Sequence, residues 1–270
     1  MILVICMAGL NTRFHNVGFD VPKYLLPWNQ GTVIGSILGE MTASFRFERI
    51  ILLPNKRDNY FEDQLLEAVA PFDIGAKDIV FIGDTAGQAH TAALGAQVAL
   101  EVALEAEAGV GGGSQIAFHN ADTIIAKRDF AGIASALEEA DAHIDIFSAS
   151  SPQYSYVQLK AGKVVRIAEK NVISPFASSG LYAFRSIDFY LDQFNSTRGE
   201  KTEAGGKGDE IYIADLLQHI LEAGGDISVN EISQAQETTV LGTPEEYGIE
   251  HARLTLARYG RELAQLKGQK

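Results

Sequence analysis

The sequence predicts an α/β fold with three layers, in which a mostly parallel, mixed sheet lies between two layers of helices. Short runs rich in β-branched residues alternate with longer amphipathic stretches, which is the order expected when helices join the strands of a parallel sheet. The first run, residues 1–6, is apolar throughout, as in a central strand that is buried on both faces. A length of 270 residues suits one large domain of this class or at most two small ones.

The amino-terminal part of the chain supplies most of the parallel strands. We expect strands at 1–6, 49–53, 79–82 and 115–118, and helices near 32–44, 56–69 and 87–108. The glycine-rich run 109–113 has the composition of a domain linker, but strand character resumes at residue 115. We therefore interpret the run as a flexible connection between a helix and a strand of one domain.

The chain after residue 140 is richer in strands. We expect strands at 144–149, 155–159 and 164–168, with a turn at Ala161-Gly162, and helices at 186–194 and 209–223. Residues 245–266 carry apolar side chains among charged ones, which predicts a terminal helix packed on the surface of the domain.

Charge and cysteine content exclude several classes of protein. The chain has 22 Lys and Arg residues against 35 Asp and Glu residues, and its net charge of −13 disfavours binding to the phosphates of nucleic acids. A hydrophobic fraction of 46% is typical of a folded globular protein. The single cysteine, Cys6, leaves no internal disulfide and no cysteine cluster for zinc. Because the apolar start of the chain is too short for a membrane span or a signal peptide, we expect a cytoplasmic protein.

A loop suited to phosphate binding follows the first strand. Residues 7–14 are Met-Ala-Gly-Leu-Asn-Thr-Arg-Phe, and residues 22–27 are Pro-Lys-Tyr-Leu-Leu-Pro. A loop of this kind presents backbone N–H groups to an anion, and Arg13 adds a side chain that bonds phosphate oxygens in pairs. The run matches neither the Walker loop nor the Gly-x-Gly-x-x-Gly pattern of dinucleotide sites. On its own, it equally fits a glycine turn that binds no ligand.

The stretch from Met7 to Pro27 resembles the signature of nucleotidyltransferases that join a nucleoside triphosphate to a sugar 1-phosphate. It is most similar to the subgroup with Met-Ala-Gly-x-Gly-Ser-Arg-Phe, and it departs from that pattern at Asn11, where glycine is usual. Because asparagine tolerates a positive φ, the loop can still close, with a side chain that narrows the approach of the phosphates. The resemblance implies the Rossmann-like fold of nucleotide-diphospho-sugar transferases.

The resemblance also implies roles for the residues of this stretch. Arg13 and Lys23 would be catalytic, because they bind the two phosphate groups that the reaction brings together. The nucleotide would contact the loop residues Ala8, Gly9, Leu10, Asn11 and Thr12.

A second stretch, residues 83–89, opens the alanine-rich helix at the place where this family recognises the nucleobase. By resemblance, Gly87 and Gln88 bind the nucleotide. The alternative interpretation is a helix cap, with Thr85 near the first turn and the glycine permitting the bend.

The candidate metal ligand is Asp122, which follows a predicted strand at its carboxyl end, where open α/β sheets bind ligands. By resemblance it is catalytic and coordinates Mg²⁺, although a turn-capping role is the alternative. We interpret His119 as a packed residue, since no second histidine stands at metal-site spacing.

Many family members carry a second metal-binding aspartate where this chain has Val240. Glu237 could replace it, water and phosphate could complete the metal shell, or turnover is impaired.

The sugar-phosphate site is predicted by a third group of residues. The Glu-Lys pair at 169–170 and the run Gly-Leu-Tyr-Ala-Phe at 180–184 are similar to elements of the same family. The resemblance implies that Glu169 accepts hydrogen bonds from sugar hydroxyls, that Lys170 lies near the sugar phosphate, and that Gly180 lets the sugar approach the backbone, with Tyr156 in the same site. A surface Glu-Lys pair is the alternative. Asp209 would lie beside the sugar pocket or only cap a helix.

These elements predict a single nucleotidyltransferase domain over residues 1–270. Residues 1–140 would form the nucleotide-binding half, 141–244 the sugar-phosphate-binding half, and 245–270 the C-terminal helix. The expected reaction is Mg²⁺-dependent transfer of a nucleotidyl group from a nucleoside triphosphate to a sugar 1-phosphate, giving a nucleotide sugar and pyrophosphate. No nucleic acid or membrane partner is expected, the oligomeric state stays open, and the resemblance suggests synthesis of bacterial surface polysaccharide or capsule precursors.

Two other functions remain as alternatives. Asn11 and Val240 motivate a non-catalytic homologue that binds nucleotide sugars or regulates other proteins. A glycosyltransferase of related fold is ranked last, because it would need an Asp-x-Asp pair, and neither Asp141 nor Asp145 has a second aspartate two residues away.

Overall fold

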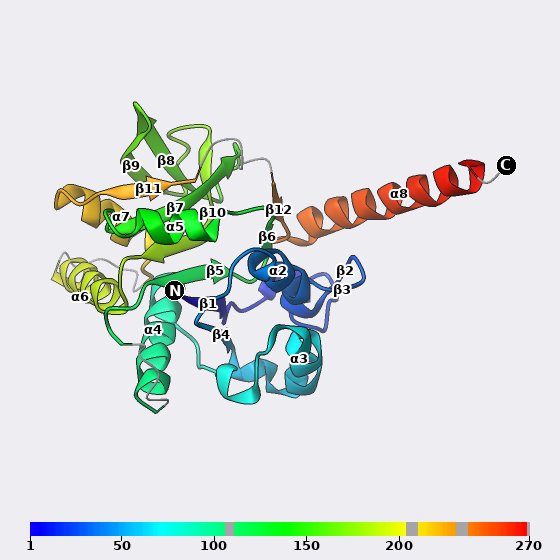
Figure 1. The fold of residues 1–270 in the computed structure, drawn as a ribbon, viewed down its shortest axis with the longest axis horizontal. Helices are drawn as coiled ribbons and strands as arrows, with labels where there is room; N and C mark the ends of the chain where they lie inside the picture. The colour runs from blue at the N-terminus through cyan, green and yellow to red at the C-terminus, as the bar shows by residue number, and fades with distance from the viewer. Residues whose placement is uncertain (106–110, 204–209, 231–236, 269–270) are drawn as a thin grey trace.

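The computed structural model describes residues 1–105, 111–203, 210–230 and 237–268, and its centre is an eight-stranded mixed sheet (Figure 1). Six of the strands follow one another in the order β11-β7-β10-β5-β1-β4. β1 pairs in parallel with β4 and β5, and β7 pairs in parallel with β11, whereas β10 runs antiparallel to both β5 and β7. Their bounds are β1 Ile2–Met7, β4 Arg49–Pro54, β5 Ile116–Asn120, β7 Ala142–Ser148, β10 Phe176–Phe184 and β11 Ile227–Val229. The predicted α/β class with a mostly parallel, mixed sheet is confirmed.

Three antiparallel pairs complete the β structure. β8 (Ser155–Lys160) and β9 (Lys163–Glu169) form a hairpin around the predicted turn at 161–162, and β8 attaches to β10. β6 (Thr123–Ile125) pairs with β12 (Thr238–Val240), and β2 (Pro27–Trp28) pairs with β3 (Gly31–Thr32). The β6–β12 pair brings residues 238–240 beside the turn that follows β5.

Helices cover both faces of the sheet. The α-helices are α1 Thr12–His15, α2 Val33–Thr42, α3 Glu62–Val69, α4 Gln88–Glu105, α5 Phe130–Ala136, α6 Ile187–Glu203, α7 Ile213–Glu222 and α8 Pro244–Gly268. Short 3-10 helices are η1 Lys23–Leu25, η2 Lys56–Phe61, η3 Ala70–Phe72 and η4 Ala76–Asp78. One apolar cluster joins the sheet to α4, α6 and α7, and a second joins it to α2, α3 and α5.

The composition of β1 follows from its place between these two clusters. Ile2 and Val4 are buried in the first cluster, whereas Leu3 and Ile5 are buried in the second, and all four side chains are fully inaccessible. Successive side chains of a strand point to opposite faces, so a strand covered on both sides needs apolar residues at every position.

Two predicted elements differ from the observed ones. Residues 79–82 do not form a strand of the sheet; they run beside β4 and make isolated bridges to Leu52 within it and to Asn55 just after it. The expected helix 56–69 is divided into η2 and α3, because the Asn55 side chain accepts a hydrogen bond from the backbone N–H of Arg57 and opens a tighter turn there.

Other predictions fall at the edges of the described chain. The helix expected at 209–223 begins at Ile213, where the Asp215 carboxylate accepts a hydrogen bond from the backbone N–H of Tyr212. Asp209 lies outside the described residues, as do residues 109 and 110 of the glycine run. The helix expected at 186–194 continues to Glu203.

The terminal helix α8 is not packed along the surface as predicted. Figure 1 shows that it extends away from the domain. Tyr247 is buried against Phe14, Phe19 and Trp28, and Leu254 is half-buried on the same cluster. Among the described side chains of α8, those that contact the domain therefore lie in its first turns. The sequence pattern correctly predicted a helix here. Its apolar residues lie on two faces, however, and the domain covers only one of these faces.

A fully buried ion pair joins the β6–β12 pair to the main sheet. The Arg128 guanidinium donates to both carboxylate oxygens of Asp145 on β7, at 2.6 and 3.1 Å, and neither side chain is accessible. Arg128 also donates to the carbonyl oxygen of Ala126 and to the hydroxyl oxygen of Thr238. Because both charged groups are away from water, removal of one leaves the other charge uncompensated.

We expect Asp145→Ala to destabilise the fold by about 3–5 kcal/mol, since it leaves the Arg128 guanidinium buried without its counter-ion. The free energy of unfolding in urea measures this loss. The control is Glu237→Gln, which removes a half-exposed partner of Lys127 and should cost less than about 1 kcal/mol. The double variant Arg128→Met/Asp145→Leu should regain much of the lost stability; a loss for Asp145→Ala no larger than the control would contradict the argument.

Candidate functional site

A cavity of about 680 Å³ lies at the carboxyl ends of β1 and β5, where open α/β sheets bind their ligands. Its walls come from residues 6–14, 84–91, 120–123, 153–155, 178–182 and 240–246, with Lys23, Glu169, Lys170, Glu210 and Tyr212 between them. Segments far apart in the sequence therefore converge on one space.

Most of the predicted site residues line this cavity. They are Ala8, Gly9, Leu10, Asn11, Thr12, Arg13, Lys23, Gly87, Gln88, Asp122, Glu169, Lys170 and Gly180. Tyr156 is the exception and requires a correction: it is fully buried in β8, and its hydroxyl donates to the carbonyl oxygen of Ser151. Side chains alternate along a strand, so Ser155 faces the cavity and Tyr156 faces the core.

The phosphate-type loop connects β1 to the short helix α1. Asn11 adopts a left-handed conformation with φ of 54°, which is the tolerance that the sequence argument invoked. Its amide Nδ2 donates to the carbonyl oxygen of Val21 at 3.3 Å, and this bond ties the loop to the segment that carries Lys23. A Cβ atom on Gly9 would have no neighbour within 4 Å, so the backbone there is open to a ligand.

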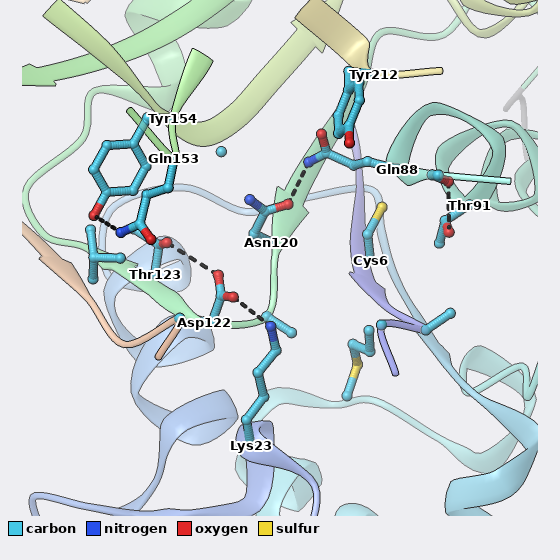
Figure 2. Close-up of a pocket in the computed structure, with 18 of the residues that line it drawn as sticks. Cys6, Lys23, Gln88, Thr91, Asn120, Asp122, Thr123, Gln153, Tyr154 and Tyr212 are labelled. Atoms are coloured by element: carbon cyan, nitrogen blue, oxygen red, sulfur yellow. Dashed lines mark hydrogen bonds and ion pairs between the residues drawn. The ribbon is translucent and has the colours of Figure 1, made fainter. Parts of the chain in front are cut away.

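Lys23 and Asp122 meet across the cavity (Figure 2). The Lys23 Nζ atom lies 2.5 Å from Asp122 Oδ2, and the two side chains are 22% and 18% exposed. Burial raises the pKa of Asp122, but the charge and hydrogen bond of Lys23 outweigh it and hold the pKa below its ordinary value. Asp122 is therefore ionised at neutral pH.

The turn that presents Asp122 rests on a buried histidine. The ring Nε2 of His119 lies 2.7 Å from the carbonyl oxygen of Thr123, and the side chain is fully buried. Burial lowers the pKa of His119 to about 4, so the ring is neutral. His119 is thus a packed residue, as the sequence indicated.

Gly87 is held close to the segment that precedes α7. Its φ is +97°, and a Cβ atom there would lie 2.9 Å from the carbonyl oxygen of Ile211. The next residue, Gln88, donates from Nε2 to Oδ1 of Asn120 at 2.5 Å, while the hydroxyls of Thr85 and Thr91 lie 2.7 Å apart (Figure 2). The glycine here makes room for the chain segment at 210–211.

The wall formed by β8, β9 and β10 carries the predicted sugar-phosphate residues. The Ser155 hydroxyl donates to the Glu169 carboxylate, and burial raises the pKa of Glu169. Lys170 has a left-handed backbone, and its ammonium donates to the Tyr212 hydroxyl at 2.5 Å. A Cβ atom on Gly180 would overlap the Asn120 amide, so this glycine lets Asn120 lie against β10.

A hydrogen-bonded group of four residues that the sequence reasoning missed is centred on Glu246, near Asp122. The Gln153 amide and the Tyr154 hydroxyl each donate to Glu246 Oε1 at 2.7 Å, and the Thr243 hydroxyl donates to Oε2 at 3.0 Å. A Cβ atom on Gly242 would lie 3.3 Å from Asp122 Oδ2 and 3.6 Å from Glu246 Oε2, so the two carboxylates face the same space. The signal available in the sequence was Glu246, the second glutamate of the run Glu245-Glu246-Tyr247.

The structure also describes Val240, at the position where many members of the family that the sequence resembles carry a second aspartate. Val240 pairs with Thr123 and lines the cavity, and the backbone N–H of Leu241 donates to the carbonyl oxygen of Asp122. Glu237, which the sequence offered as a substitute, lies at the other end of β12 and pairs with Lys127 at 3.0 Å. It does not line the cavity.

The donor set around Asp122 consists of hard oxygen atoms. Within the described ranges, no group of three or more His, Cys, Asp or Glu side chains is placed to hold a metal ion. The carboxylates of Asp122 and Glu246 fit Mg²⁺, which proteins bind through one or two carboxylates together with substrate phosphates.

The architecture is that of sugar-phosphate nucleotidyltransferases. A nucleoside-diphosphate-sugar pyrophosphorylase from Vibrio cholerae RC9 matches with a TM-score of 0.72 and 25% sequence identity, over 91% of this chain and 98% of that one. A chain from Bacillus anthracis described as a glucose-1-phosphate thymidylyltransferase gives 0.69 and 17%, over 94% of each chain. The inositol-1-phosphate CTP transferase of T. maritima gives 0.60 and 13%, over 91% and 90%.

Comparison of the sequence with protein-family models and with curated proteins finds no match. Among the helices that the structure describes, none is both long and apolar enough to cross a membrane.

We expect Lys23→Met to reverse the direction of the pKa shift at Asp122. The wild-type pKa is lowered, so the ionised Asp122 stabilises the fold at neutral pH, and this contribution is lost as the pH falls through the folded-state pKa. Without the ammonium, burial is the largest remaining influence and raises the pKa against the smaller lowering effects of His119 and the Thr123 hydroxyl, so protonation then stabilises the fold as the pH falls.

An NMR titration of the Asp122 carboxyl carbon measures both pKa values, with Asp122→Asn identifying the resonance. Unfolding experiments at several pH values give the matching stability difference. A pKa that stays lowered in Lys23→Met would show that Lys23 is not the cause.

Proposed function

We propose that the protein transfers a nucleotidyl group from a nucleoside triphosphate to a sugar 1-phosphate, with Mg²⁺, giving a nucleotide sugar and pyrophosphate. The observation that carries this proposal is the convergence of the loop 8–13, Lys23 and Asp122 with Glu169 and Lys170 on one cavity. The activities named for the structural neighbours support the same reaction class.

The nucleotide belongs on the β1 side of the cavity in this proposal. Its phosphates would take hydrogen bonds from the backbone at Gly9 and from Arg13, and its base would lie near Gly87 and Gln88. The sugar phosphate belongs at the wall formed by β8, β9 and β10, with Lys170 near its phosphate and Glu169 on its hydroxyls. Residues 1–140 and 141–244 then act as two halves of one domain.

For this reaction the protein needs mainly to position the two substrates and to neutralise their charges. A phosphate oxygen of the sugar 1-phosphate attacks the α-phosphorus in line, the bond to the β-phosphate oxygen breaks, and pyrophosphate leaves with that electron pair. The attacking oxygen is already anionic, so no general base is needed. Arg13 and Lys23 offset the repulsion between the two anions.

The buried titratable groups agree with such a mechanism. His119 is neutral and bonded to the Thr123 carbonyl, so it is not placed to move a proton. Cys6 lines the cavity, but burial raises the pKa of its thiol to about 12, so it is no nucleophile at neutral pH. Nothing in this mechanism requires either group to react.

We assign the metal to Asp122, with Glu246 as the second carboxylate in place of Val240. When bound, Mg²⁺ would neutralise the phosphate charge that develops on the leaving pyrophosphate. Glu246 is suited to the role because the described structure gives its carboxylate three neutral donors, Gln153, Tyr154 and Thr243, and no ion pair. Its negative charge is thus held in a fixed orientation without being cancelled.

The setting of the reaction follows from its substrates. We infer that the protein works in the cytoplasm, where nucleoside triphosphates are available, and that its product serves the synthesis of surface polysaccharide or capsule. With a net charge of −13, nucleic acid is not among the proposed partners.

A glycosyltransferase is disfavoured by the places of its candidate aspartates. Asp141 pairs with Arg185 and accepts a hydrogen bond from the backbone N–H of Asp226, and Asp145 is buried against Arg128. Neither aspartate lines the described cavity.

The test of the reaction is pyrophosphate release from a panel of nucleoside triphosphates and sugar 1-phosphates with Mg²⁺. We expect one pair to react, and Asp122→Ala and Lys23→Ala to lower the rate by about 10²-fold or more. Glu237→Gln, which changes a carboxylate outside the cavity, should retain activity.

If the folded protein releases no pyrophosphate with any pair of triphosphate and sugar 1-phosphate, the proposed enzyme activity is contradicted. Calorimetry with nucleotide sugars would then distinguish the non-catalytic binding protein, which the apolar Val240 beside Asp122 favours. Binding without turnover is the result that this alternative predicts.

We expect Glu246→Gln to weaken Mn²⁺ binding by about tenfold or more, because it removes one of the two carboxylates in the metal space. Glu245→Gln is the matched control, since Glu245 is exposed on the same turn of α8 and does not line the cavity. Electron paramagnetic resonance of free Mn²⁺ measures the affinity without reference to activity. Equal affinities of the two variants would remove Glu246 from the metal site.

A further inference from the structure

The helix α8 has a short anchored part and a long free part. Its first turns lie on the domain through Tyr247, whose hydroxyl donates to the carbonyl oxygen of Pro27, and through Leu254. His251 adds a ring contact to Trp28. Beyond Leu254 the helix extends away from the domain (Figure 1), and residues 255–259 are all exposed.

The anchoring residues and the exposed apolar residues lie on opposite faces. Tyr247, His251 and Leu254 are separated by four and three positions, so they share the face that meets the domain. A second set, here called the outer stripe, comprises Ile249, Ala252, Leu256 and Tyr259, and the sequence continues the same spacing to Leu263 and Leu266. At 100° per residue, this stripe points away from the anchoring face.

The outer stripe exposes three large apolar side chains on one face of the helix. Ile249 is 48% exposed, Leu256 is 71% exposed and Tyr259 is 61% exposed. The residues of the outer stripe are spaced alternately by three and four positions, which is the a/d heptad pattern of a coiled coil. Position a is occupied by Ile249, Leu256 and Leu263, and position d by Ala252, Tyr259 and Leu266. Such a pattern is used when another helix packs along it.

The free part of α8 needs a partner on energetic grounds. From Thr255 to Gly268 it has 14 residues, which is close to the length at which an isolated helix is marginal in water. Gly260 lies within this part and costs the helix about 0.5–1 kcal/mol relative to alanine. Most helical stability in proteins comes from packing of an apolar face, and the domain leaves Ile249, Leu256 and Tyr259 of this face uncovered.

We propose that the outer stripe binds the same stripe of a second copy of the chain, in a parallel two-helix coiled coil. The charges that flank the stripe favour this occupant. Glu262 stands at g and Lys267 at the following e, and in a parallel pair g of one helix faces e of the next heptad in the other. An antiparallel pair would instead bring e positions together, and these include Arg253 and Lys267.

The geometry of the anchor allows this pairing. The domain lies on the face of α8 opposite the outer stripe, so two domains would lie on the outer sides of the helix pair and leave the seam free. The same geometry keeps the outer stripe from folding back onto its own domain. A symmetric pair closes on itself and exposes no further stripe.

A lipid surface is the other occupant to be weighed. Membrane-surface helices present a broad apolar face, whereas the outer stripe is a narrow a/d seam flanked by Arg253, Thr255, Glu262 and Lys267. The net charge of −13 also opposes binding to anionic lipid. A second copy therefore fits the stripe better.

Sedimentation velocity of the full chain tests the proposal. We expect the wild type to sediment as a dimer and Leu256→Glu to raise the dimer dissociation constant at least tenfold. Ala257→Glu is the matched control, because it adds the same charge at the next exposed position, outside the stripe, and should stay dimeric. A monomeric wild type, or equal dimerisation of the two variants, would overturn the proposal.

The orientation of the helices is tested by disulfide formation at Leu266→Cys. In the parallel pair, the two d positions at 266 face each other and should cross-link on mild oxidation, whereas Ala264→Cys, at an outer b position, should not. The native Cys6 lies on β1 within the sheet and not on α8. Absence of the cross-link at 266 would overturn the parallel arrangement.

Flotation with vesicles that contain 30% phosphatidylserine distinguishes binding to a lipid surface from pairing with a second copy. We expect the wild type to stay unbound. Co-flotation that Leu256→Glu abolishes and Ala257→Glu retains would assign the outer stripe to a membrane and overturn the proposal.

Discussion

The parallel pairing of β1 with β5 is the constraint on which the cavity depends. The register sets Ile2 opposite Ile116 and Cys6 opposite Asn120, so both strands end at the same edge of the sheet. The phosphate-type loop leaves one strand there, and the turn that carries Asp122 leaves the other. The ion pair between Lys23 and Asp122 then holds the two connections together across the space between them.

The sequence was informative where local pattern and chain order determine position. The apolar run of β1 predicted a strand covered on both faces, and the resemblance from Met7 to Pro27 predicted which loop would border the cavity. Asp122 could be chosen because it directly follows a strand whose carboxyl end lies at the ligand-binding edge. These inferences need only the order of residues along the chain.

Sequence reasoning failed where position depends on a partner distant in the chain. Tyr156 and Ser155 differ by one residue, and the pairing of β8 with β9 and β10 decides which of them faces the cavity. Glu246 stands beside Asp122 because β12 pairs with β6, a contact that no local pattern encodes. The pattern of α8 likewise specified two apolar faces without showing that the domain covers only one.

The antiparallel strand β10 has a consequence for folding during synthesis. It lies between β5 and β7, although both of these strands precede it in the chain. Until residues 176–184 have been made, β5 lacks a neighbour along one edge, and β7 lacks a neighbour along both, because β11 follows later still; the backbone groups on these edges stay unpaired. Such open edges pair readily with other chains. The nascent protein is therefore most exposed to aggregation in the interval between the synthesis of β7 and that of β10.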